Sequence, residues 1–153
     1  MYQTLTFYHN SMRWLVLLSL LLALYRAYKG YFSKSEFSKT DNAIRHWTAT
    51  IAHIQLMIGM ILYFQSPMIQ YFFANFKTAV HQDFSMLFFG LIHSSLMLIS
   101  IVLITIGSAS SKRKETDTAK FKTMMIWFTI ALVIIFIAIP WPFSPLANRP
   151  YFR

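Results

Sequence analysis

The chain has 153 residues, which suits one domain and leaves no room for a separate soluble module. Hydrophobic residues make up 56% of it and charged residues only 12%, a balance that points away from soluble domains and towards the membrane class. The net charge of +9 could indicate nucleic-acid binding, but the basic residues lie between apolar runs, so we expect no nucleic-acid partner. The absence of cysteine excludes disulfides, thiolate metal sites and covalently attached haem, leaving histidine as the strongest metal ligand.

Four apolar segments follow one another along the chain. We predict membrane-spanning helices at 11–28, 43–66, 84–106 and 123–139. A cleaved signal peptide is the alternative for the first segment, but its charge pattern and the lack of a small-residue cleavage site favour a retained helix. The sequence therefore predicts an all-α fold, an integral membrane four-helix bundle forming a single domain over 1–153.

The ends of these segments carry further signals. Thr40, Asp41 and Asn42 are N-cap candidates for the second segment, and Asp83 is one for the third. The fourth segment stops where three prolines occur within 140–145. The connection 67–82 is rich in apolar and aromatic residues, so we expect a short amphipathic element that anchors it at the membrane interface, with a lid over the bundle as the alternative.

Basic residues are distributed unevenly between the connections. Because positively charged loops stay in the cytoplasm, we expect both basic connections there and both termini on the outer, periplasmic side. Ten basic residues belong to one side of the predicted bundle: Arg26, Lys29, Lys34, Lys39, Arg45, Lys112, Arg113, Lys114, Lys120 and Lys122. The other side has Arg13, Lys77, Arg149 and Arg153. The expected location is the bacterial inner membrane, with the chain crossing it several times.

The polar residues inside the predicted helices limit the chemistry. Asp and Glu are absent from all four apolar cores, which disfavours a proton relay, a carboxylate-bound cation or a transporter. Phosphate-binding glycine loops, nucleophile elbows and HExxH are absent as well. The core retains His53, Gln55 and His93 together with small hydroxyl residues.

His53 and His93 are the candidate ligands of a cofactor. Counting from the predicted outer ends of their helices places His53 roughly 20 Å and His93 roughly 14 Å deep, which we treat as comparable. Two imidazoles converging from facing helices would suit one b-type haem (heme b), with His53 and His93 as axial ligands of its iron. The alternative is that both histidines form ordinary hydrogen bonds between helices, for which Ser94 and Ser95 are adjacent partners.

Three further residues complete the predicted site. Gly90 lies one turn before His93, where a missing side chain would let a flat macrocycle pack against the backbone. Arg13, at the outer end of the first helix, could pair with haem propionates. His9 shares a helical face with Arg13 if that helix begins early, and could serve an outer quinone or proton site or act as an alternative ligand.

The chain as a whole resembles a family of small four-helix bacterial inner-membrane proteins labelled cytochrome b. The resemblance rests on these stretches: His9-x-Ser-x-Arg-Trp, His53-Ile-Gln, Gly59-x-x-Leu-Tyr-Phe-x-Ser-Pro, His93, Ile104-Thr-Ile-Gly and Ile139-Pro-Trp-Pro-Phe. It implies a haem-binding protein in which His9, His53 and His93 are the matching histidines. Two positions depart from the family pattern: Phe121 stands between two lysines where a histidine is usual, and Ile92 stands where an acidic residue usually precedes the third histidine.

The expected function is therefore electron transfer by a b-type cytochrome, within or beside a respiratory or quinone-linked complex. The small amount of loop favours an electron-transfer subunit over a standalone enzyme. The competing interpretation is a haem-free accessory or scaffold subunit that packs against a larger membrane complex through its apolar faces.

Overall fold

The computed structural model describes residues 2–147 and 149, and every regular element within them is helical. Four segments have the length and hydropathy to cross a membrane: Tyr2–Ser33, Lys39–Gln65, Phe84–Lys112 and Asp117–Ala138. They confirm the predicted all-α architecture of four membrane-spanning helices and make the chain a multi-pass membrane protein. Arg153, one of the predicted flanking charges, lies outside the described residues.

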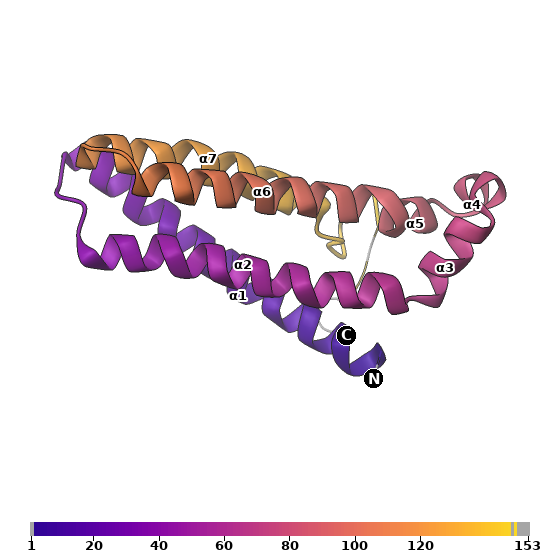
Figure 1. Cartoon of the computed structure of the whole chain (residues 1–153). Helices are drawn as coiled ribbons and strands as arrows, with labels where there is room; N and C mark the ends of the chain where they lie inside the picture. Colours follow the sequence, from indigo (N-terminus) through magenta and orange to yellow (C-terminus); the bar gives the residue numbers. More distant parts are fainter. Residues whose placement is uncertain (1, 148, 150–153) are drawn as a thin grey trace.

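The four spans contain or are joined by shorter helices. In chain order the elements are α1 (Tyr2–Ser33), α2 (Lys39–Gln65), α3 (Pro67–Ala74), α4 (Phe76–Gln82), α5 (Phe84–Leu87), the π-helical turn η1 (Phe88–Ile92), α6 (His93–Lys112) and α7 (Asp117–Ala138). Helix α6 packs along α7, α1 packs on both α2 and α7, and α2 packs on α6. Figure 1 shows the long helices running alternately up and down the length of the bundle.

The bundle has two chemically different ends. At one end, the connections 34–38 and 113–116 meet, and the rings of Phe37 and Phe121 lie 4.9 Å apart between their centroids. We call this the loop end. The opposite end holds the beginning of α1, the end of α2, α3, α4 and the end of α7 (Figure 1). We call it the His9 end, after the histidine on α1.

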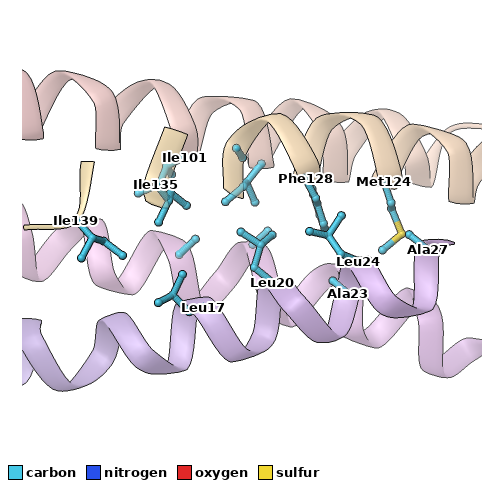
Figure 2. Close-up of a cluster of buried hydrophobic side chains, with 14 of the residues drawn as sticks. Leu17, Leu20, Ala23, Leu24, Ala27, Ile101, Met124, Phe128, Ile135 and Ile139 are labelled. Carbon is cyan, nitrogen blue, oxygen red and sulfur yellow. The ribbon is translucent and has the colours of Figure 1, made fainter. Parts of the chain in front are cut away.

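The hydrophobic core lies mainly between α1, α6 and α7. Small residues on α1, such as Ala23 and Ala27, are fully buried and let the neighbouring helices approach closely. Phe128 and Met124 of α7 fill the space opposite them, as Figure 2 shows. Gly30 of α1 serves the same purpose near the loop end, because a Cβ there would lie 2.3 Å from the Phe121 ring.

Helix α1 begins well before the predicted span, since residues 2–10 are also helical. Their polar composition concealed this extension, and it places His9 firmly on α1. Helix α2 begins at Lys39, and its N-cap is Ser38 rather than one of the predicted candidates. Asp41 is the third helical residue and accepts a hydrogen bond from the Ser38 backbone N–H at 2.9 Å, completing a capping box. The predicted cap at Asp83 is confirmed, because its side chain accepts from the Ser85 N–H at 2.8 Å.

The aromatic connection between α2 and α5 forms the two short helices α3 and α4. Ser66 caps α3 and Pro67 occupies its first turn, a position that suits proline. The fully buried Phe72 points from α3 towards η1, whereas Phe73 and Phe76 are exposed. The connection is thus helical and attached to the bundle by Phe72, while part of its aromatic surface remains available to a membrane interface.

Candidate functional site

Two histidines meet at the His9 end. The imidazole of His9 on α1 and that of His93 at the start of α6 have ring centroids 6.4 Å apart and planes inclined by 73°. The rings of Phe88 and Phe89 lie 5.9 Å and 6.0 Å from that of His93. The structure therefore pairs His93 with His9, which the sequence offered only as an alternative ligand.

The position of His93 depends on how α7 ends. In a regular helix, the carbonyl groups of Phe136 and Ala138 would accept from the backbone nitrogens of residues 140 and 142, but both of those are prolines and have no N–H. The Trp141 indole N–H donates to the Phe136 oxygen at 2.8 Å instead. The second carbonyl, that of Ala138, lies 2.8 Å from Nδ1 of His93. The proline-rich end of α7 thus supplies the acceptor that orients His93.

This contact also fixes the tautomer of a neutral His93. A carbonyl oxygen can only accept, so Nδ1 of His93 must carry the proton and donate it to Ala138. The other ring nitrogen, Nε2, then keeps its lone pair. A backbone carbonyl that holds Nδ1–H is a common support for a histidine that binds a metal through Nε2.

A π-helical turn immediately precedes His93. The backbone N–H of His93 donates to the carbonyl of Phe88, five residues earlier, instead of four. Such turns insert one residue into a helix and occur frequently at functional sites. The inserted residue turns the His93 side chain to a different face of the helix. A regular α-helix counted from Phe84 would place His93 on another face.

The surroundings of His9 contain unsatisfied polar atoms. Gln55 on α2 donates from Nε2 to the backbone carbonyl of His9 at 2.9 Å. Nδ1 of His9 and Oε1 of Gln55 are both buried, and neither has a hydrogen-bond partner among the described residues. Gly59, one turn further along α2, lies against the imidazole, because a Cβ there would be 3.0 Å from Cε1 of His9. Buried polar atoms without partners are uncommon and call for a ligand or water.

Arg13 lies beside this histidine pair. It follows His9 by one helical turn, and its side chain is only 8% exposed. The guanidinium carbon stands 5.3 Å from the ring centre of Trp14 and 6.0 Å from that of Trp141, both within cation–π range. The site thus combines two imidazoles, one amide and one guanidinium.

His53 lies elsewhere in the structure. Its Nε2 is 2.9 Å from the hydroxyl of Thr105, and that hydroxyl donates its own proton to the carbonyl of Ile101 at 2.7 Å. Nε2 of His53 therefore acts as the donor. Thr105 follows His93 by 12 residues on α6, or about 18 Å along the helix axis. This separation is far too large for His53 and His93 to bind one iron, so the predicted pair does not fit this structure.

Gly90 also has a different neighbour from the predicted one. A Cβ at Gly90 would lie 2.7 Å from the ring of Phe72, so the space left by the glycine is filled by α3. Its carbonyl accepts a hydrogen bond from the Tyr63 hydroxyl at 2.6 Å. Gly90 thus joins α3 and α2 to the π-helical turn, and the expected macrocycle contact is replaced by a protein contact.

The sequence draws attention to His9, Arg13 and Gln55. It does not show that Gly59 lies against His9 or that the Ala138 carbonyl holds His93. The two prolines that leave the carbonyl groups free are the signal that could have revealed the acceptor. Within residues 2–147 and 149, no group of three or more His, Asp or Glu side chains could hold a metal ion. Any metal here would have to bring further ligands of its own, as the iron of a haem does.

Comparisons with protein-family models, curated proteins and solved structures gave no match. The fold defines the class, a multi-pass helical membrane protein with a buried polar site at one end.

Proposed function

We propose that the chain is a cytochrome b-like membrane protein that binds one haem b through His9 and His93 and transfers single electrons within the membrane. The pairing of these two imidazoles is the observation that carries the proposal. When bound, haem would supply the one-electron chemistry, and His9 and His93 would hold its iron.

The spacing of the rings supports this ligand pair. Two imidazoles this close together would be the residues that hold the iron, because histidine is a ligand that haem iron accepts. The observed separation is 6.4 Å. His93 is held through Nδ1, so the lone pair of its Nε2 would be the donor to iron, and His9 has a buried nitrogen, Nδ1, without a partner among the described residues.

The remaining residues of the His9 end have definite tasks in this proposal. Phe88 and Phe89 are the aromatic neighbours of His93 and would exclude water from it. Arg13 would offset the negative charge of the propionates through charge-assisted hydrogen bonds. The proline-rich end of α7 would keep the His93 ring from rotating, because its carbonyl acceptor is fixed.

The orientation belongs to the proposal as well. Because basic residues gather at the loop end, we place that end in the cytoplasm, and the His9 end and both termini on the outer side of a bacterial inner membrane. The electron would then be exchanged near the outer surface, with the quinone pool or a respiratory complex as the partner.

The test is a reduced-minus-oxidised absorption spectrum of the purified chain. A b-type band is expected for the wild type, and His9→Ala and His93→Ala should each abolish or broaden it. The control variants His53→Ala, His46→Ala and His81→Ala should keep it unchanged, since the proposal gives none of these three residues a part in holding haem. Loss of the band in His53→Ala with retention in His9→Ala would reverse the ligand assignment.

A haem-free accessory subunit is the second candidate, and the packing of the His9 end favours it. Phe72 fills the space beside Gly90, and Gly59 lies directly against His9, so protein atoms occupy both positions where a glycine would admit a macrocycle. A colourless protein with full helix content, in which His9 and His93 serve only to join helices, would support this function over electron transfer.

A further inference from the structure

A small polar pocket lies at the loop end, away from the histidine pair. It has a volume of about 250 Å³ and is formed where α2 begins, α6 ends and α7 begins. Its lining comprises Phe37, Ser38, Lys39, Asn42, Lys112 and Lys120. Three lysines from three helices thus line one pocket.

The side-chain amide of Asn42 is oriented with its donors available. Its Oδ1 accepts from Nε and Nη2 of Arg45 at 3.3 Å and 2.9 Å. The Arg45 guanidinium is itself held by the carbonyl of Ser108 at 2.9 Å, so it cannot turn away from Asn42. Because the amide oxygen is occupied, Asn42 presents its NH₂ group, which has two donors.

The other polar groups of the pocket are either already hydrogen-bonded or positively charged. The Ser38 hydroxyl makes two hydrogen bonds with Asp41: it donates to Oδ2 and accepts from the backbone N–H. Lys120 is held by Asp117 at 3.1 Å. Lys39 and Lys112 are exposed, and neither forms an ion pair with any described residue. The pocket therefore offers several donors, and its lining contains no carboxylate.

Positive charge exceeds negative charge at this end. Ten of the 14 basic residues belong to the loop end, against four acidic residues, and two of these four, Asp41 and Asp117, are already paired. The excess positive charge therefore has no protein counter-ion.

We propose that this pocket binds the phosphate group of an anionic phospholipid. The pocket lies where two membrane-spanning helices begin and a third ends, which is the depth of lipid headgroups. Lys39 and Lys112 would provide charge-assisted hydrogen bonds to phosphate oxygens, and the Asn42 NH₂ group would provide a further donor. Phe37 forms an apolar wall next to them, which suits a glycerol backbone better than a free, fully hydrated phosphate.

The test is a lipid titration of the detergent-solubilised full chain, with bound lipids counted by native mass spectrometry. Phosphatidylglycerol is expected to bind the wild type at least tenfold more tightly than phosphatidylcholine. The double variant Lys39→Gln/Lys112→Gln should weaken phosphatidylglycerol binding by about tenfold or more, since it removes two direct charge-assisted donors to the phosphate oxygens.

The matched control is Lys34→Gln/Lys114→Gln, which removes the same charge from the same end but not from the pocket. It should keep most of the affinity, and equal losses in both variants would overturn the site in favour of a diffuse field. Competition by inorganic phosphate at the same concentration as the lipid would overturn the lipid as the ligand. Unchanged circular dichroism spectra of both variants are required for the comparison.

Discussion

The two ends of the bundle handle buried polar groups in opposite ways. At the loop end, the buried side chains of Asp41 and Arg45 both have several partners: Asp41 binds Arg26 and Ser38, and Arg45 binds Asn42 and Ser108. At the His9 end, atoms of His9 and Gln55 are buried without a hydrogen-bond partner among the described residues. Satisfied groups stabilise the fold, whereas unsatisfied ones cost free energy unless something else binds them. For these buried groups, the difference assigns a structural role to Asp41 and Arg45, and it leaves His9 and Gln55 as the groups that the proposed haem site would use.

The largest stability effect is expected for Asp41→Ala. The Asp41 side chain is 1% exposed, lies 2.7 Å from Arg26 and completes the α2 capping box, so its loss should lower the free energy of unfolding by about 2–3 kcal/mol. Unfolding in a denaturing-detergent titration measures this change. The control is Asp117→Ala, whose side chain is 38% exposed, so water screens its pairing with Lys120 and the variant should have a much smaller effect. Equal effects of both variants would contradict a structural role of the buried pair.

An intermediate effect is expected for Gly90→Ala at the other end. The added methyl group would collide with the Phe72 ring, so α3 or the π-helical turn must move, at a cost of about 1–3 kcal/mol. The same titration measures it. The double variant Gly90→Ala/Phe72→Leu should recover part of the loss by making room. If stability did not recover, the loss in Gly90→Ala would come from the π-helical turn itself and not from the contact with Phe72 of α3.

A small stability effect with a clear local readout is expected for Gly59→Ala. The helix-favouring methyl group stabilises α2 by about 0.5–1 kcal/mol, which offsets the crowding of His9, so the free energy of unfolding should change little. The imidazole must nevertheless shift, and the NMR resonances of His9 labelled at its ring should move while those of His53 stay constant. Equal shifts of both rings would contradict the contact between Gly59 and His9.

The smallest effect is expected for Thr105→Val. His53 is exposed and its hydrogen bond to Thr105 is a single neutral contact, so its removal should cost about 1 kcal/mol or less. The denaturing-detergent titration again measures it. Thr129→Val, which removes the hydroxyl near Tyr28, is the matched control and should behave alike. A loss as large as that of Asp41→Ala would make the His53 contact a main support of the fold.

The spans could be predicted from the sequence, because an apolar run of sufficient length has few alternatives to a membrane helix. The partner of His93 could not be predicted from the sequence. Counting residues from helix ends gives a depth but not the register between helices, and here Tyr63 reaches Gly90 while His53 reaches Thr105. The π-helical turn adds a residue just before His93, which changes its face, and no pattern in the sequence marks that turn.

His9, and not His53, lies beside His93, and we propose that this pair binds haem. The most direct measurement is the amount of haem b per chain, determined by extraction from the purified wild type and the single variants His9→Ala and His53→Ala. We predict one haem per chain in the wild type and in His53→Ala, and less than about one-tenth of that in His9→Ala because an axial ligand is lost. Full retention of haem in His9→Ala, or a wild-type protein without haem, would contradict the account.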